Sequence, residues 1–134
     1  MILFDTSAIY ALADRDDPAH GRAKAILQDL AANHRPLLLH GYVLCEASAL
    51  LQARLGAGTA EGFLKDAARH EVAWVDGAIH AEALKEFSRL GARGVSLVDC
   101  VSFILMRRRR VTTAFAFDRH FVQQGFTLAG PPPG

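Results

Sequence analysis

The sequence is poor in cysteine and carries almost no surplus charge of either sign. Cys45 and Cys100 are its two cysteines, and they form no close C-x-x-C pair. This argues against a disulfide framework or a zinc knuckle, and it fits the reducing cytoplasm. The 15 Lys and Arg residues nearly balance the 14 Asp and Glu residues, giving a net charge of +1. A strongly basic nucleic-acid-binding domain is therefore excluded, and any polyanion site has to be local.

The chain also lacks a long apolar run. Leu97–Met106 is interrupted by Asp99 and Ser102 and has about half the length of a membrane-spanning helix. The apolar N-terminus reaches Asp5 almost at once and follows no basic region, so we expect neither a signal peptide nor a membrane association. With 51% hydrophobic and 22% charged residues, the composition is that of a globular protein. We predict one domain, residues 1–128, and a disordered proline-rich tail, residues 129–134.

Short apolar runs alternate along the chain with segments of helical periodicity. The apolar runs show no polar–apolar alternation, which is typical of strands covered on both faces. The helical segments begin near Asp5, Asp16–Pro18, Tyr42, Thr59, Asp76 and Ser96. The predicted strands are Ile2–Phe4, Leu37–Leu39, Val72–Val75, Val111–Phe117 and, at a sheet edge, Phe126–Leu128. This order predicts an α/β fold, a three-layer α/β/α arrangement around a central, mostly parallel sheet of four or five short strands.

Two carboxylates directly follow predicted strands. Asp5 follows the first strand and Asp118 the fourth. The carboxyl ends of parallel strands meet at one edge of the sheet, where the sites of such folds lie, so both side chains are expected there. Each alone also fits a helix N-cap, and for Asp5, beside Thr6 and Ser7, the cap explains the residue as well as a functional role does.

Two further carboxylates lie in helical segments. Glu46 is on the margin of the apolar stripe of its helix, between Val43 and Leu50. We expect it to face the body of the protein and to need a cation, a donor or a metal ion, although a salt bridge to an arginine would also serve. Ser96 and Asp99 have the spacing of a capping box, and such a helix start also suits an approaching phosphate.

These four carboxylates, Asp5, Glu46, Asp99 and Asp118, would repel one another at one sheet edge at neutral pH. A divalent cation resolves that repulsion. Oxygen ligands suit Mg²⁺ or Mn²⁺, whereas zinc prefers His or Cys, and the six histidines show no ligand spacing. Such a site can activate water and hold a phosphodiester oxygen, so hydrolysis of a phosphate ester is the predicted chemistry.

Four segments, in order and rough spacing, resemble PIN-domain ribonucleases and, among them, the VapC-type toxins of bacterial toxin–antitoxin modules. They are ILFDTSAIYALADRDDPAH, YVLCEASALL, SLVDCVSFILMRRRR and AFAFDRHF, and the resemblance covers Met1 to about Phe126. It implies that Asp5, Glu46, Asp99 and Asp118 form the acidic catalytic and metal-binding set, with Asp5 and Asp99 as direct ligands. It further implies a dimeric endoribonuclease that uses Mg²⁺ or Mn²⁺ and is silenced by a small antitoxin.

Polar residues around this set are candidates for substrate contacts. The resemblance places Thr6, Ser7 and Ser96 around the metal or against phosphate. Arg119 and His120 directly follow Asp118, where Arg can pair with the phosphate backbone. The block Arg107–Arg110 is better explained by the dipole at a helix C-terminus and a solvated face.

Two positions depart from the family pattern. Many relatives carry a Thr or Ser pair where this chain has His40 and Gly41, and they often carry Thr where it has Ala116. The carboxylates are retained. The changes affect the hydroxyl contacts around the metal, and through them the rate and substrate preference.

Two other functions compete with the ribonuclease. A catalytically silent PIN-like module could bind RNA or a protein and regulate through that contact, but a polyanion binder gains nothing from clustered negative charge. A haloacid-dehalogenase-like phosphatase also begins with a strand ending in Asp, but it needs a second Asp where Ser7 stands. The sequence therefore favours a metal-dependent endoribonuclease, with the toxin role resting on the resemblance.

Overall fold

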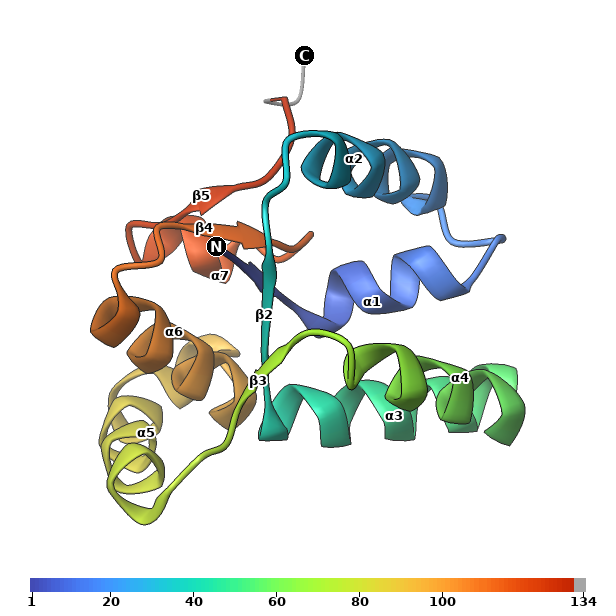
Figure 1. Cartoon of the computed structure of the whole chain (residues 1–134). Coiled ribbons are helices and arrows are strands. Elements are labelled where there is room, and N and C mark those ends of the chain that lie inside the picture. The colour runs from blue at the N-terminus through green and yellow to red at the C-terminus, as the bar shows by residue number, and fades with distance from the viewer. Residues whose placement is uncertain (132–134) are drawn as a thin grey trace.

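The computed structural model describes residues 1–131 and contains a five-stranded sheet covered by helices on both faces (Figure 1). The strands are β1 (Ile2–Phe4), β2 (Leu37–His40), β3 (Glu71–Ala73), β4 (Thr113–Phe115) and β5 (Thr127–Leu128). The helices are α1 (Thr6–Ala13), α2 (His20–Ala32), α3 (Gly41–Leu55), α4 (Ala57–Ala67), α5 (Gly77–Leu90), α6 (Leu97–Arg109) and α7 (His120–Gln123), with a 3₁₀ turn η1 (Gly91–Arg93). The predicted three-layer α/β/α fold is confirmed.

All strand pairs of the sheet are parallel, in the order β3-β2-β1-β4-β5. The chain adds β2 and β3 on one side of β1, and β4 and β5 on the other, so the winding reverses between β1 and β4. The Asp5 N–H donates to the Phe115 carbonyl at 3.0 Å and ties the two strand ends together. Parallel sheets place their sites at this kind of switch point, and Asp5 and Asp118 follow the two strands that flank it.

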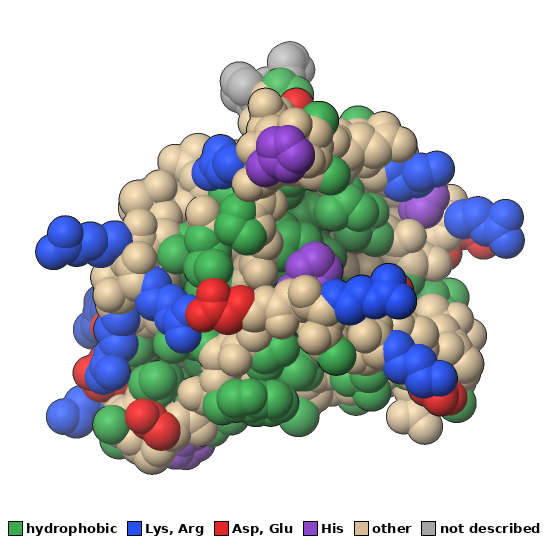
Figure 2. Space-filling model, in the orientation of Figure 1, with side chains coloured by type: hydrophobic (Ala, Val, Ile, Leu, Met, Phe, Trp, Pro, Cys, Tyr) green, Lys and Arg blue, Asp and Glu red, His purple; other side chains and the backbone are tan. Residues whose placement is uncertain are grey.

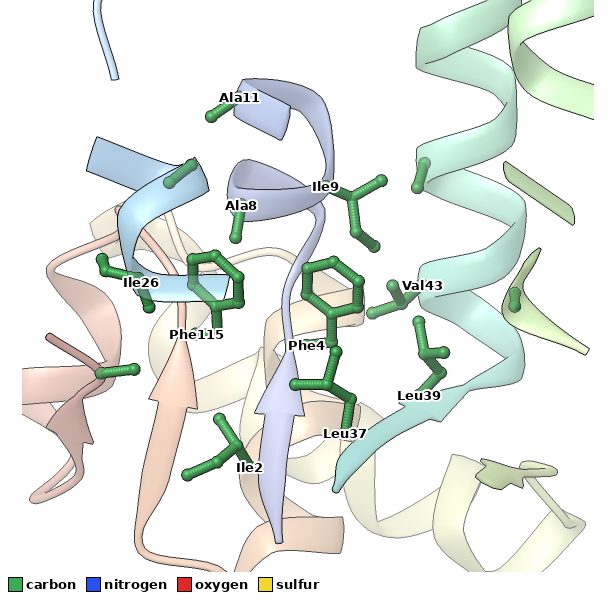
Figure 3. Close-up of a cluster of buried hydrophobic side chains, with 14 of the residues drawn as sticks. Ile2, Phe4, Ala8, Ile9, Ala11, Ile26, Leu37, Leu39, Val43 and Phe115 are labelled. Atoms are coloured by element: carbon green, nitrogen blue, oxygen red, sulfur yellow. The ribbon is translucent and has the colours of Figure 1, made fainter. Parts of the chain in front are cut away.

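Successive residues of the strands enter two separate cores. Ile2 and Phe4 face the helices α1 to α4, whereas Leu3 faces α5, α6 and α7. In the first core Phe4 stacks on Phe115 of the neighbouring strand, with ring centroids 5.4 Å apart (Figure 3). Because both faces of β1 are buried, its backbone is fixed, and the residue that follows it is held in a defined position.

Three helices begin with the caps that the sequence predicts. Oδ2 of Asp5 accepts from the Ser7 N–H, and Oδ1 of Asp76 accepts from the Ile79 N–H. Ser96 and Asp99 form a reciprocal capping box at the start of α6. These caps satisfy backbone donors that have no partner inside the helix.

Two predicted helix starts are wrong. α2 begins at His20 rather than at Asp16–Pro18, because Oδ1 of Asp17 accepts from the Ala19 N–H and closes a turn ahead of the helix. α4 begins directly after Gly56, which has a φ of 99°, so Thr59 lies inside the helix rather than at its cap.

The C-terminal boundary of the folded part also lies later than predicted. Ala129 is buried, and its N–H donates to the Ala114 carbonyl at 2.8 Å. The Pro131 carbonyl accepts from Arg22 of α2. Residues 129–131 therefore contact the domain, while the remainder of the predicted tail, 132–134, lies outside the described residues. Among the described helices, none is long and apolar enough to cross a membrane.

Candidate active site

Asp5 is buried at the carboxyl end of the central strand, with 4% of its surface exposed. Its Oδ2 accepts from both the N–H and the hydroxyl of Ser7, at 3.1 and 2.6 Å. The pKa of this carboxyl is raised to about 6, chiefly by burial and also by the charges of Asp99 and Asp118, against the lowering effect of the two Ser7 hydrogen bonds. Asp5 is thus both the predicted N-cap and a member of an acidic cluster, so the two explanations of this residue are compatible.

Asp99 enters the same cluster from the first turn of α6. It is buried, and its Oδ2 accepts from the Ser96 N–H at 3.1 Å, while its own N–H donates to Oγ of Ser96. Burial raises the pKa of the carboxyl, followed by the charges of Asp118 and Glu46, against the lowering effect of the Ser96 hydrogen bonds. Because several charges act on one another here, the cluster favours a bound cation.

Asp118 lies between β4 and α7, His120 is the first residue of α7, and both side chains lie close to that of Asp99. Oδ1 of Asp118 accepts from the His120 N–H at 2.9 Å. Nδ1 of His120 lies 2.9 Å from that oxygen and 3.8 Å from Oδ2 of Asp99, but it is buried and forms no hydrogen bond of suitable geometry with the described residues. Asp99, Asp118 and His120 each offer one ligand atom, and these atoms lie within 4.8 Å of one another.

Glu46 is exposed, contrary to the prediction that it faces the body of the protein. The buried stripe of α3 is Val43, Ala47 and Leu51, and Glu46 lies just outside it, on the side open to solvent. Its charge nevertheless raises the pKa of Asp99, so it borders the cluster. Glu46 is therefore a carboxylate at the rim of the site.

The hydroxyls predicted around the metal have different surroundings. Oγ of Ser7 donates to Asp5 and accepts from the Phe117 N–H at 2.9 Å, so it joins the ends of β1 and β4. Oγ of Ser96 is taken by the α6 cap. Oγ1 of Thr6 is buried and makes no hydrogen bond with the residues that the structure describes, which leaves a polar atom available next to Asp5.

The arginine block at the C-terminal end of α6 differs from Arg119, which follows Asp118. Arg107, Arg108 and Arg109 form ion pairs with Glu86, Glu82 and Glu71, which supports the structural explanation of this block. Arg119 is exposed beside Asp118.

His40 is the last residue of β2 and directly precedes α3. It is fully buried, and its Nδ1 accepts from the Val43 N–H and so caps α3. The other ring nitrogen, Nε2, lies 2.8 Å from Oγ of Ser102, whose hydroxyl donates to the Val98 carbonyl. Since Nδ1 accepts, Nε2 carries the proton, and burial lowers the pKa of the ring to about 4. A neutral histidine thus links the start of α3 to α6.

A large cavity lies away from the carboxylates. It has a volume of about 580 Å³ and is lined mainly by apolar residues of α1, α2 and α4, among them Leu12, Leu27 and Phe63. Figure 2 shows hydrophobic side chains gathered in a central hollow of this face, with Lys and Arg side chains around it. None of the acidic residues of the cluster lines this cavity, so it is a separate feature.

The residues of the cluster fit a divalent cation. The charges of Asp99 and Asp118 raise the pKa of Asp5, and the charge of Asp118 raises the pKa of Asp99. Two buried polar atoms, Nδ1 of His120 and Oγ1 of Thr6, make no hydrogen bond with the described residues. Ligand atoms about 2.1 Å from one ion and at right angles are about 3 Å apart, close to the separation of His120 and Asp118. A divalent cation placed here could be bound by the carboxylate oxygens and by the lone pair of His120 Nδ1.

A doubly wound parallel sheet with clustered carboxylates at its switch point defines a class of α/β domains with an acidic site. The chain belongs to the PIN domain family, whose profile matches residues 2–126. It is 33% identical to the 23S rRNA-specific endonuclease VapC20 of Mycobacterium tuberculosis, in strain CDC 1551 and in strain H37Rv alike; the match covers 98% of this chain and 99% of the relative. The crystal structure of M. tuberculosis VapC20, described as a sarcin–ricin loop cleaving toxin, matches with a TM-score of 0.81 and 32% identity over 95% of this chain and 97% of that chain.

Proposed function

We propose that this protein is a metal-dependent endoribonuclease that hydrolyses RNA phosphodiester bonds and serves as the toxin of a type II toxin–antitoxin module. The observation that carries the proposal is the convergence of Asp5, Asp99 and Asp118 from three separate elements, with Nδ1 of His120 within 2.9 Å of Asp118 and 3.8 Å of Asp99. Such a cluster is costly unless a cation neutralises it. The similarity to a 23S rRNA-specific endonuclease supports RNA, and ribosomal RNA in particular, as the substrate.

Each residue of the site has a defined part in the proposed reaction. Asp5, Asp99, Asp118 and His120 would hold the cation, which when bound supplies a water of lowered pKa and neutralises charge on the phosphate. Ser7 fixes the orientation of Asp5 by its hydrogen bonds. Glu46, at the exposed rim, accepts the proton of the attacking water. The water attacks phosphorus, the bond from phosphorus to the leaving ribose oxygen breaks, and that oxygen takes up a proton from solvent.

His120 bears on which metal the site prefers. An imidazole nitrogen is a softer donor than a carboxylate oxygen, so one such ligand favours Mn²⁺ over Mg²⁺. We expect the electron spin-echo spectrum of bound Mn²⁺ to show coupling to a ¹⁴N nucleus. His120→Ala should remove this coupling and weaken Mn²⁺ binding in calorimetry by roughly tenfold or more, about 1.4 kcal/mol per tenfold. The matched control is His70→Ala, because His70 is exposed and outside the cluster.

A wild-type Mn²⁺ spectrum without nitrogen coupling would show that His120 does not bind the metal, and would favour a contact between His120 and the RNA phosphate. In that case His120→Ala should leave Mn²⁺ affinity unchanged and weaken RNA binding only.

The proposed activity is tested by incubating purified protein with ribosomal RNA, with Mg²⁺ or Mn²⁺ and with EDTA. We expect cleavage that needs the metal and is lost in Asp99→Asn, because the variant keeps an oxygen for the α6 cap but removes a charge from the metal site. In cells, the wild type should arrest growth and Asp99→Asn should not. Intact RNA together with no heat of Mn²⁺ binding would identify a silent module instead.

The partners follow from the proposed toxin role. We expect a homodimer in the cytoplasm and a small antitoxin that silences the site. The apolar cavity between α1, α2 and α4 has the size and lining to take the apolar face of an antitoxin helix.

A further inference from the structure

Trp74 stands at the edge of the sheet where the carboxylates gather. It is the single tryptophan of the chain, 72% exposed, and it directly follows the last residue of β3. His40 of β2 pairs with Ala73, and continuing the pairing of Leu3 with Leu38 places Asp5 beside His40. Neighbouring strands are about 4.8 Å apart, so Trp74 lies roughly 10 Å across the sheet from Asp5, at the same end of the strands.

The indole of Trp74 is held against the start of α3. A Cβ on Gly41 would lie 3.2 Å from Cε3 and 3.5 Å from Cζ3 of the indole, so a glycine is what permits this close approach. Gly41 is also one of the positions where the chain departs from the family's hydroxyl pair. The benzo edge of the ring therefore contacts backbone, while most of the ring surface is open to solvent.

We propose that Trp74 is a stacking platform for an unpaired nucleobase of the RNA, close to the scissile phosphate. Proteins recognise unpaired bases by stacking them on aromatic side chains, and each such contact contributes strongly to binding. This inference rests on the proposed ribonuclease function and adds a base-binding subsite to it. Purines present more surface than pyrimidines, so the subsite favours a purine.

The position of Trp74 distinguishes it from the other exposed apolar residues. Isolated exposed apolar side chains are common and need no explanation. Leu64, Leu84 and Phe87 are less exposed and lie within α4 and α5. Trp74 instead follows a strand, like Asp5 and Asp118, and the end of β3 borders the start of the helix that carries Glu46. A base on this platform would extend the RNA from the acidic cluster across the edge of the sheet.

The first test uses the intrinsic fluorescence of Trp74, which reports on this position alone because the chain has no other tryptophan. The probe is an RNA stem-loop with the sarcin–ricin loop sequence, bound by Asp5→Asn protein with Mg²⁺ so that no cleavage occurs. We expect saturable quenching, with the same dissociation constant as fluorescence anisotropy of labelled RNA. Binding by anisotropy without any change in tryptophan fluorescence would overturn the proposal.

The second test compares variants in binding and cleavage. Trp74→Ala should weaken RNA binding and raise KM by roughly 5- to 100-fold with kcat nearly unchanged, whereas Trp74→Phe should stay within about threefold of wild type. The matched control is Leu84→Ala, which truncates an exposed apolar residue within α5 and should have no effect. Gly41→Ala keeps the indole but crowds it, and should cause a smaller loss.

An abasic scan of the loop identifies the base. One abasic position should weaken binding to wild type and have no further effect on Trp74→Ala, because the base and the ring act as a pair. Equal penalties in both proteins at every position would overturn the proposal. So would a Trp74→Ala variant that loses its oligomeric state in light scattering while keeping RNA affinity, which would assign Trp74 to a protein interface.

A wild type that cleaves no RNA refutes the ribonuclease function itself, whereas equal cleavage by wild type and Trp74→Ala refutes the platform alone.

Discussion

Asp5→Asn is expected to abolish RNA cleavage and, at the same time, to stabilise the metal-free protein at neutral pH. The activity should fall by at least about 10³-fold, because the variant removes a charge from the metal site. A bound metal ion stabilises the transition state by several kcal/mol. The fold is retained because Asn also serves as an N-cap and can accept from Ser7. Initial rates on RNA with saturating Mn²⁺ measure the loss.

The stabilisation follows from the raised pKa of Asp5. A carboxyl whose pKa rises from 3.8 to about 6 in the folded state holds its proton more tightly there, so its contribution to stability is present at low pH and is lost as pH rises through 6. Ionised Asp5 therefore costs about 3 kcal/mol at pH 7.5, of which we expect Asp5→Asn to recover about 1–3 kcal/mol. Urea unfolding in EDTA at pH 7.5 measures the gain.

Asp16→Asn is the matched control, because Asp16 is exposed and outside the cluster, and it should change neither activity nor stability. An Asp5→Asn variant that cuts RNA at the wild-type rate would contradict the proposed site. An Asp5→Asn variant that is inactive but less stable than wild type would agree with the proposed site, but it would contradict the expected destabilisation of the folded protein by ionised Asp5.

His40→Ala is expected to give the largest loss of stability, about 3–5 kcal/mol. The variant leaves a cavity in the core, removes the α3 cap to Val43 and leaves Ser102 without its histidine partner. His40→Asn, whose side-chain oxygen is able to cap α3, should lose less. His70→Ala, at an exposed histidine, should change little. Urea unfolding at pH 7.5 separates the four proteins, and a His40→Ala midpoint equal to that of His70→Ala would contradict the structural role.

The pH dependence of stability gives opposite signs for His40 and Asp5. His40, with its pKa lowered from 6.5 to about 4, stays neutral when folded, so its stabilising contribution is present above pH 6.5 and is lost as pH falls toward 4. Asp5 changes stability in the other direction over nearly the same range. As the pH is lowered from 6 to 4 in EDTA, the free energy of unfolding of Asp5→Asn should therefore fall steeply, and that of His40→Asn should rise. The wild type should show a change between these two.

The fold could be predicted from the sequence because its signals are local. The unbroken apolar runs Ile2–Phe4 and Leu37–Leu39 indicate strands buried on both faces, and the caps at Asp5, Asp76 and Ser96 act within a few residues. The boundaries that were wrong, at Pro18 and Thr59, lie where a turn or a glycine competes with the helix signal. The placement of residues 129–131 depends on contacts with β4 and α2, which no local pattern contains.

The sequence by itself determined which carboxylates end the central strands, because strand direction and order of elements decide which residues reach the carboxyl edge. Only the tertiary structure decided the rest of the site. It placed Glu46 at an exposed rim, brought Nδ1 of His120 between Asp118 and Asp99, and set Trp74 against Gly41. These positions depend on how α3, α6 and the strand ends pack on the sheet. Helical periodicity predicts only roughly which side of a helix a residue lies on. The distances between side chains of separate elements are fixed by the packing of those elements alone.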